Sequence, residues 1–235
     1  MKISSIQKLE QSIGYNFIDN NLLIESLSHP SLKQHSTKSD SIKNYERLEL
    51  LGDSILSFVI TEILFKNFSL YSEGKLAKIR SHLICKEMLC NIANKLNLAE
   101  YIIMTHGEEL GGGRTNPNNI ENVMEALIGA IYLDSDINVI KTIIHNLWSE
   151  FLSNPDLIIF DPKTTLQELT QSKFGCKPIY EIIKKEGLAH STFFTIMVTV
   201  NEYNGIGQGY SVKKAEKEAA EQLLTSLGIT KPKNN

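Results

Sequence analysis

The sequence predicts an all-α domain followed by a small α+β domain. Up to about residue 152, apolar side chains recur at three- and four-residue spacing, which is typical of amphipathic helices. After that, alternating apolar and polar residues appear, which is typical of half-buried strands. The net charge changes with the pattern, from −5 over residues 1–160 to +2 over residues 161–235. We therefore expect two domains, residues 1–155 and 161–230, with different tasks.

Length and composition exclude several classes of protein. The chain has 235 residues, of which 42% are hydrophobic and 22% charged, close to the globular average. No apolar run approaches the roughly 20 residues that span a bilayer, and the first residues lack the apolar core of a secretory signal. Three cysteines without metal-ligand spacing indicate neither a disulfide framework nor structural zinc. We expect a cytoplasmic protein that does not bind membranes.

Three segments of the first domain carry the clearest helical periodicity: residues 48–65, 76–96 and 120–133. Turn signals separate them, namely Tyr-Ser-Glu-Gly at 71–74 and three consecutive glycines at 111–113. Pro117, within the run Asn-Pro-Asn-Asn, predicts the start of a helix with an asparagine as its N-cap.

The second domain follows the order helix, strand, strand, strand, helix. Helical patterns cover residues 163–172 and 212–227, strand patterns cover residues 179–183 and 194–200, and residues 205–210 form a glycine-rich strand or turn. Two helices can cover one face of such a sheet and leave the other face in water.

The most informative segment is Asn-Tyr-Glu-Arg-Leu-Glu-Leu-Leu-Gly-Asp-Ser at residues 44–54. On a helix, Glu46, Glu49 and Asp53 fall within an arc of about 60° on one face. These carboxylates repel one another, and a hard divalent cation such as Mg²⁺ or Mn²⁺ would relieve that repulsion. A solvated helix face explains the same pattern without any function, and the spacing alone favours that alternative.

A second helix presents Asn122 and Glu125, which are three residues apart and share a face. Glu125 precedes an almost wholly apolar run, so we expect it to be partly buried, where an unpaired carboxylate is costly. Glu73, in the turn before the segment 76–96, is either an acid that favours the helix dipole or a further site residue.

These residues resemble the ribonuclease III family. Four blocks match its motifs in order along the chain: residues 27–31, 46–54, 73–76 with Arg80, and 122–134. The resemblance extends from about residue 5 to about residue 228, and it reverses the preference for a solvated face. It implies a homodimeric, all-α endonuclease domain in which each subunit contributes one acidic cluster to a valley that holds an RNA duplex.

The resemblance also implies roles for individual residues. Asp53 and Glu125 are expected to matter most for catalysis, and Mg²⁺ is the expected cofactor, with Mn²⁺ as a substitute. A metal-activated water that attacks in line would leave a 5′-phosphate and a 3′-hydroxyl. Four residues match the metal-binding positions of the family: Glu49, Asn122 and Glu125 as direct ligands, and Asp53. Glu46 and Glu73 match the outer acids that lie near the cleaved strand.

The sequence departs from the family pattern at two of these places. Asn122 stands where relatives mostly have Asp, and a neutral amide oxygen can still bind Mg²⁺. We therefore expect a weaker metal site and a higher Mg²⁺ requirement rather than inactivity. Leu50 stands where many relatives have a Phe that inserts into the partner subunit. Leucine is smaller but apolar, so we expect this dimer contact to survive with less buried area.

The second domain resembles a double-stranded RNA-binding domain. Lysines beside a helix N-terminus suit phosphates across a groove, and such domains read A-form shape rather than sequence. Read without the resemblance, a lysine run is a solvated helix face, and a loop histidine has no role. Three patches carry the match: Thr164, Gln167 and Glu168 on the first helix; His190 and Ser191 in the loop; Lys213, Lys214 and Lys217 on the last helix.

The sequence therefore predicts a metal-dependent endonuclease that is specific for double-stranded RNA and processes ribosomal RNA precursors and structured messenger RNAs. The alternative is a non-catalytic RNA-binding or ribosome-associated protein with a metal site weakened by Asn122. Retention of Glu49, Asp53 and Glu125 favours the enzyme, because a chain that had lost catalysis should have lost these acids too. A purely structural helical dimer is disfavoured by the second domain.

Overall fold

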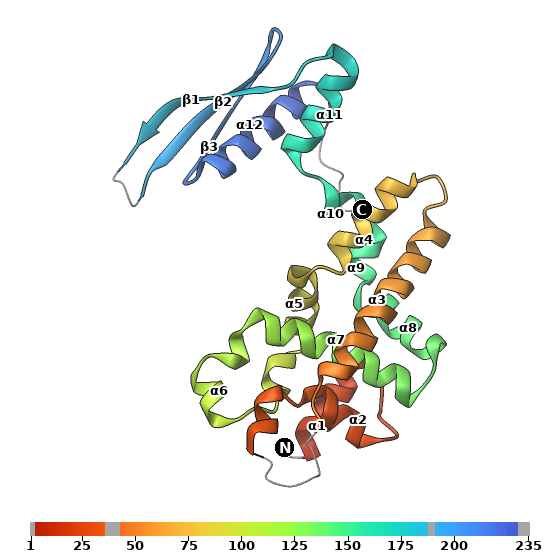
Figure 1. The fold of residues 1–235 in the computed structure, drawn as a ribbon. Coiled ribbons are helices and arrows are strands. Elements are labelled where there is room, and N and C mark those ends of the chain that lie inside the picture. The colour runs from red at the N-terminus through yellow and green to blue at the C-terminus, as the bar shows by residue number, and fades with distance from the viewer. Residues whose placement is uncertain (1–2, 36–42, 188–190, 230–235) are drawn as a thin grey trace. The chain divides into compact units, whose positions relative to one another are not determined.

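The computed structural model describes residues 3–35, 43–187 and 191–229. The chain divides into two compact units, Met1–Ile158 and Ile159–Asn235, and each buries a hydrophobic core of its own. The first unit is built from helices, and the second combines helices with three strands (Figure 1). The predicted fold class, an all-α domain followed by an α+β domain, is confirmed. None of the helices in the described ranges combines the length and the apolarity of a membrane span.

The first unit is organised around two long helices, α3 (Glu46–Asn67) and α7 (Pro117–Asp134), which pack against each other (Figure 1). α7 is the more central of the two, because every residue from 126 to 131 is buried. The remaining helices are α1 (Ile3–Ile13), α2 (Asn20–Leu27), η1 (Pro30–His35), α4 (Glu73–Leu83), α5 (Lys86–Lys95), η2 (Leu98–Tyr101), α6 (His106–Leu110), η3 (Gly113–Thr115), α8 (Ile137–Leu147), α9 (Ser149–Ser153) and α10 (Asp156–Ile159).

The segment 76–96, which shows one helical pattern in the sequence, is divided between α4 and α5. Cys85 has extended backbone (φ −75°, ψ 159°) and serves as the N-cap residue of α5. The apolar spacing runs through this break, since Leu83 and Leu89 are both fully buried. Periodicity alone therefore does not reveal a break this short.

The two ends of α7 are held by side chains. At the start, Asn116 accepts a hydrogen bond from the N–H of Asn118 at 3.0 Å, and a proline takes the first helical position, as the sequence predicts. At the other end, Asp134 accepts hydrogen bonds from the Tyr15 hydroxyl (2.7 Å) and from the N–H groups of Ile18 (2.7 Å) and Asp19 (2.8 Å). The segment between α1 and α2 is thereby tied to the last residue of α7.

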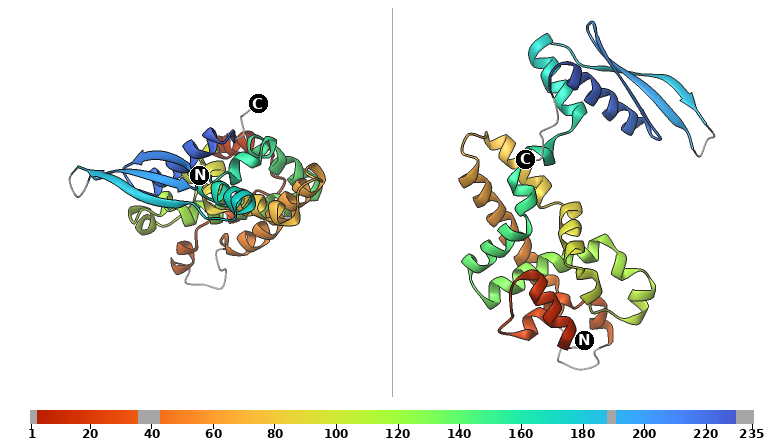
Figure 2. Two further views of the ribbon diagram at one scale, coloured as in Figure 1. Left: turned by 90° about the horizontal axis from the view of Figure 1, so that it is seen from above. Right: turned by 180° about the vertical axis from the view of Figure 1, so that it is seen from behind.

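The second unit is an antiparallel sheet, in the order β1-β2-β3, with both helices packed on the same face (Figure 2). Its core joins Leu166, Val198, Ala219 and Leu223. The residues predicted as a glycine-rich strand or turn are mostly strand, and β1 extends beyond the predicted range. The elements are α11 (Pro162–Phe174), β1 (Ile179–Glu186), β2 (Phe193–Val200), β3 (Tyr203–Gly209) and α12 (Val212–Ser226).

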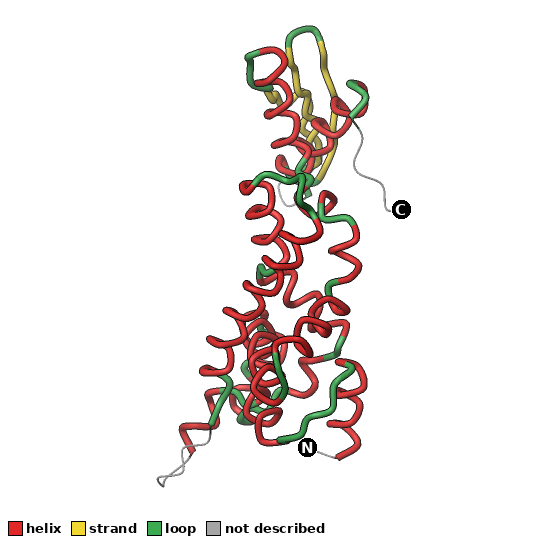
Figure 3. Tube along the Cα trace, turned by 90° about the vertical axis from the view of Figure 1, so that its right-hand side faces the viewer, coloured by secondary structure: helices red, strands yellow, loops and turns green. Residues whose placement is uncertain are grey.

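The two edges of this sheet differ. β3 lies along α12, and the N–H groups of Ile206 and Gln208 donate to the side chains of Gln222 and Glu218 on that helix. β1 forms the other edge of the sheet, whose strands are yellow in Figure 3. Seven of the eight residues of β1 are exposed. Glycines in β3 make the close approach of α12 possible, because a Cβ at Gly207 would lie 2.1 Å from the nitrogen of Ala219.

Candidate functional site

The predicted acidic cluster lies where α3 and α7 cross. A Cβ at Gly52 on α3 would lie 1.8 Å from the carbonyl oxygen of Glu125. A Cβ at Gly129 on α7 would lie 2.4 Å from a carbonyl oxygen of α3. The two glycines therefore let the backbones touch, and this contact brings Glu49 and Asp53 beside the turn of α7 that carries Glu125.

The carboxylates at the crossing act on one another. Burial, followed by the charges of Asp53, Glu121 and Glu49, raises the pKa of Glu125 to about 8. Burial and the charges of Glu46, Glu121 and Asp53 also raise the pKa of Glu49. Glu49, Asp53 and Glu125 thus share one electrostatic environment, and the partial burial expected for Glu125 is confirmed. Glu121, which the sequence reading did not single out, belongs to the same environment.

Asn122 faces this cluster through its contact with a buried tyrosine. Burial raises the pKa of the Tyr45 phenol, and a hydrogen bond from the Asn122 side chain lowers it in part. The charges of Glu49 and Glu46 act on the same phenol. Tyr45 is only 2% exposed, and its ring packs edge-on against His29 with centroids 5.8 Å apart. Asn122 and Glu49 therefore border the same buried side chain.

The two outer acids differ in their relation to the cluster. Glu46 begins α3, accepts a hydrogen bond from the Asn44 side chain at 3.0 Å, and acts electrostatically on Glu49. Glu73 begins α4 directly after the N-cap Ser72. In the described part of the chain, Glu73 is not among the charges that act on Glu49 or Glu125. The structure therefore brings Glu46 to the cluster but gives no such contact for Glu73.

The arrangement is not a closed metal cage. Within residues 3–35, 43–187 and 191–229, no group of three or more His, Cys, Asp or Glu side chains is arranged to hold a metal ion. The predicted set contains an amide as well as acids, and its oxygen donors are of the type that Mg²⁺ and Mn²⁺ prefer. The set fits these cations by the chemistry of its donors, and the roles of its members remain a prediction.

A lysine stands at the rim of the cluster. The Lys86 ammonium lies 3.0 Å from a carboxylate oxygen of Glu121 and 2.7 Å from the side-chain carbonyl of Asn118. It also opposes the rise in the pKa of Glu125. Nothing in the sequence pattern singles out Lys86, because it lies 35 residues before Glu121 and meets it only through the packing of α5 on α7.

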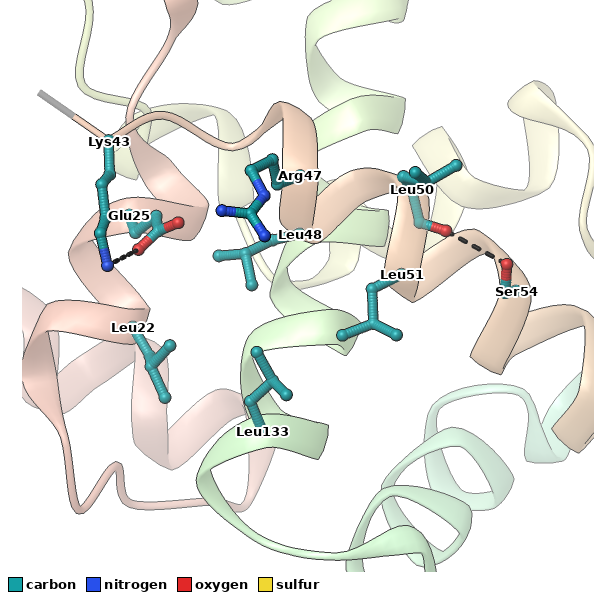
Figure 4. Close-up of a pocket in the computed structure, with 9 residues that line it drawn as sticks. All are labelled: Leu22, Glu25, Lys43, Arg47, Leu48, Leu50, Leu51, Ser54 and Leu133. Atoms are coloured by element: carbon teal, nitrogen blue, oxygen red, sulfur yellow. Dashed lines mark hydrogen bonds and ion pairs between the residues drawn. The ribbon is translucent and has the colours of Figure 1, made fainter. Parts of the chain in front are cut away.

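Leu50 lies on a different face of α3 and is 74% exposed. It borders a cavity of about 580 Å³ between α2, α3 and the end of α7, whose apolar lining includes Leu22, Leu51 and Leu133 (Figure 4). The Ser54 hydroxyl donates to the carbonyl of Leu50 at 3.2 Å beside it. An exposed leucine thus stands next to a hollow large enough to receive an apolar side chain.

In the second unit, two of the three predicted RNA-binding patches line one hollow of about 420 Å³ between α11 and α12. Thr164 and Gln167 come from α11, and Lys213 and Lys217 come from the first turns of α12. Lys217 is ion-paired with Asp161 at 2.7 Å, so its charge is partly neutralised. Glu168 and Lys214 are exposed next to these side chains in the sequence.

The third patch is described only in part. His190 lies outside the described residues, together with the two residues before it. Ser191 is described and exposed. The structure therefore leaves the predicted role of this loop untested.

Comparison with known proteins identifies the family. Residues 19–150 match the family model described as Ribonuclease-III-like, and residues 162–227 match that of the double-stranded RNA binding motif. Ribonuclease 3 of Rickettsia felis is 57% identical over 223 residues, which cover 95% of this chain and 99% of that protein. The chain belongs to the ribonuclease III family.

Further relatives agree with this assignment to the ribonuclease III family. Ribonuclease 3 of Rickettsia typhi is 58% identical over 226 residues, which cover 96% of this chain and 99% of the relative. The crystal structure of the nuclease domain of ribonuclease III from Campylobacter jejuni is 43% identical, with a TM-score of 0.56. That match covers 63% of this chain and 94% of the domain. The resemblance predicted from the sequence is confirmed, and this ribonuclease III is an endoribonuclease of the double-stranded RNA class.

Proposed function

We propose that this ribonuclease III hydrolyses both strands of RNA duplexes with Mg²⁺, or with Mn²⁺ in its place, and leaves 5′-phosphate and 3′-hydroxyl ends. One observation carries the proposal, namely that Gly52 and Gly129 let α3 and α7 touch where the acids meet. The proposed catalytic set at this crossing is Glu49, Asp53, Asn122 and Glu125.

Each member of the set has a task. Glu49, Asn122 and Glu125 would hold the metal through oxygen atoms. A bound Mg²⁺ would supply a water of low pKa and stabilise charge on the phosphoryl oxygens. Of the described charges that raise the pKa of Glu125, that of Asp53 has the largest effect. Asp53 and Glu125 together would accept protons from the attacking water, and we propose Glu46 and Glu73 as outer acids beside the RNA strand.

We propose that the second unit holds the duplex by its shape. The hydroxyl and amide of Thr164 and Gln167 suit 2′-hydroxyl groups in the shallow minor groove, and Lys213 suits a phosphate on the far side. We assign supporting contacts to Glu168, Ser191, His190, Lys214 and Lys217. Because such contacts do not read sequence, the proposed substrates are duplex stems, in ribosomal RNA precursors and in structured messenger RNAs.

We propose that the active form is a homodimer. Leu50 is exposed beside an apolar cavity, and two copies related by a twofold axis could each place this leucine in the cavity of the other. A solved structure of the Campylobacter jejuni nuclease domain is described by its region involved in dimer formation. A cytoplasmic location, finally, agrees with three free cysteines, all of them partly buried.

Cleavage of a long RNA duplex tests the catalytic proposal. Wild-type protein, a Glu125→Gln variant and a control Glu100→Gln variant are each incubated with Mg²⁺, with Mn²⁺ and with EDTA. We expect metal-dependent cleavage to short duplexes with 5′-phosphates, lost in Glu125→Gln and retained in Glu100→Gln, because Glu100 lies in η2 and is exposed. Binding without cleavage at any metal concentration would contradict the proposal and favour the non-catalytic alternative.

A further inference from the structure

Lys86 is held in one place at the rim of the acidic cluster. It begins α5, and its ammonium contacts Glu121 at 3.0 Å and Asn118 at 2.7 Å, both on α7. These contacts join the first residue of α5 to the first two turns of α7. Even so, 43% of the Lys86 side chain remains exposed.

The charge of Lys86 reaches the catalytic carboxylates. Of the described groups whose charges act on Glu125, Asp53, Glu121 and Glu49 are anions and Lys86 is the cation. The described charges that act on Glu49 are all anions. An RNA strand that enters this cluster is itself anionic, and like charges at short range repel strongly where water is partly excluded. A fixed cation at the rim reduces that repulsion.

We propose that Lys86 binds a phosphate of the RNA strand that enters the acidic cluster, next to the phosphodiester that is cleaved. An ammonium group has three N–H donors. Glu121 and Asn118 accept two of them, and the third remains on a group that is exposed. Glu121 is then a positioning residue, because it holds Lys86 and does not itself touch the substrate. The inference rests on the proposed function, since it needs a strand at Glu125.

A competing explanation is that Lys86 only neutralises Glu121 and links α5 to α7. The two explanations differ in their effect on salt dependence. Each phosphate contact releases counterions when the duplex binds. Loss of one contact therefore reduces the slope of a plot of log binding constant against log salt concentration by about one. A link between helices changes stability but not that slope.

The experiment compares Lys86→Met and Lys86→Arg with a matched control, Lys95→Met, in the full-length protein. Lys95 lies on the same helix and is ion-paired with Glu150 at 2.6 Å, with 48% of its side chain exposed. The measurements are KM and kcat for cleavage of an RNA duplex with Mg²⁺, and the salt dependence of duplex binding without Mg²⁺. The thermal midpoint of each variant is measured alongside.

We expect Lys86→Met to raise KM by roughly five- to thirtyfold, the size of one exposed charge-assisted contact, with a smaller change in kcat. Its salt slope should fall by about one, while Lys86→Arg and Lys95→Met stay near wild type. An unchanged KM and slope in Lys86→Met, beside an active wild type, would overturn the proposal. A lower thermal midpoint with an unchanged slope would overturn it too, in favour of the helix link.

The outcomes also separate this inference from the proposed function. If wild-type protein does not cleave the duplex, the proposed function is wrong. The salt slope of duplex binding still decides whether Lys86 contacts a phosphate, because that measurement needs no catalysis.

Discussion

At position 122, a neutral amide takes the place of a carboxylate beside three acids that already repel one another. A neutral residue here lowers the repulsion in the metal-free protein, but it also weakens the attraction for a divalent cation. The same side chain is hydrogen-bonded to the phenol of Tyr45 and lowers the pKa of that phenol in part. Position 122 therefore couples the affinity for metal to the packing of a buried tyrosine.

Replacing Asn122 by Asp should lower the Mg²⁺ concentration that gives half-maximal cleavage. The added charge strengthens the attraction for the cation and supplies a carboxylate ligand in place of an amide. A Mg²⁺ titration of duplex cleavage by Asn122→Asp and by wild type measures the difference. An identical Mg²⁺ dependence of the two proteins would show that the residue at 122 does not limit metal binding.

The Asp134 anchor predicts a pH-dependent stability. Burial alone would raise the pKa of Asp134, but hydrogen bonds from the Asp19 N–H, the Tyr15 hydroxyl and the Ile18 N–H outweigh it, so the pKa is lowered. The folded state therefore holds the ionised form more strongly than the unfolded state does. The resulting stability is complete above the ordinary carboxyl pKa and is lost as the pH falls through the lower folded-state value.

Replacing Asp134 by Asn should destabilise the first unit by about 1–3 kcal/mol at neutral pH, the range for hydrogen bonds to a charged group. Urea unfolding at pH 7 and at pH 3 measures the effect. The difference between variant and wild type should shrink at pH 3, because the unfolded chain then binds a proton at Asp134 and part of the advantage of the ionised folded form is lost. A difference that stays constant with pH would mean that the charge of Asp134 contributes nothing.

The sequence allowed a residue to be assigned to the site only where that residue belongs to a recognisable motif. Glu49, Asp53 and Glu125 meet as expected, and the apolar run after Glu125 correctly indicated its partial burial. Glu121 and Lys86 were not predictable, because their part in the cluster depends on how α5 and α3 pack on α7. Local periodicity carries no information on that packing.

At the scale of elements, the crossing of α3 and α7 depends on backbone contact rather than on side-chain packing. Gly52→Ala should destabilise the first unit by about 1–3 kcal/mol or more, because the added methyl meets a backbone carbonyl that no rotamer change can move. Chemical denaturation measures this, and cleavage activity should fall with the displacement of Glu125.

A helical glycine elsewhere provides the control for this substitution. A Cβ at Gly74 in α4 meets nothing within 4 Å. Gly74→Ala should therefore leave stability unchanged or raise it by about 0.4–1 kcal/mol, through the smaller entropy of the unfolded chain. Equal losses of stability in Gly52→Ala and Gly74→Ala would mean that the close contact between α3 and α7 does not determine the stability of the first unit.

Periodicity predicted the two long helices of the first unit and the order of elements in the second, but not most of the shorter helices, and it left most ends open. The start of α7 was correct in detail, because Asn116 and Pro117 act locally. The break at Cys85 was not visible, since buried residues flank it at helical spacing. Because of its glycines, the sequence of residues 205–210 was equally compatible with a strand and with a turn. They form a strand because α12 packs directly on them, which is a tertiary cause.

For the whole molecule, the proposed dimer makes the clearest prediction. Leu50→Glu should convert the protein to monomers in sedimentation experiments and abolish cleavage of both strands, because a charge would enter a mainly apolar cavity that already contains the carboxylate of Glu25. Leu70→Glu is the control, since Leu70 is 97% exposed outside that cavity. Dimers that persist in Leu50→Glu would show that the contact lies elsewhere.

A larger apolar side chain at the same position should have the opposite effect. Leu50→Phe adds apolar area that can be buried in the partner and should lower the dimer dissociation constant. Dilution series of wild type and Leu50→Phe measure this constant. An unchanged constant would mean that the cavity does not receive this side chain.

The overall charge of −3 would by itself have argued against an RNA-binding protein. The division into two units explains why that argument fails, because the whole excess of acids lies in the first unit, with the proposed metal-binding residues, and the second unit is net positive. The cations proposed to contact RNA occupy local patches, such as Lys213 beside Thr164. The distribution of charge was therefore informative where its sum was not.

The contacts between α12 and the edge of β3 bear on how the protein behaves at high concentration. The side chains of Gln222 and Glu218 accept hydrogen bonds from the N–H groups of Ile206 and Gln208. A strand from another molecule would need these N–H groups to pair with β3. Growth of the sheet into a fibril is thereby blocked on that side. In the described sheet, β1 is the edge left to accept a further strand, and its Lys184, Lys185 and Glu186 disfavour stacking of identical copies. Aggregation of this protein through its sheet should therefore begin with loss of α12 from β3.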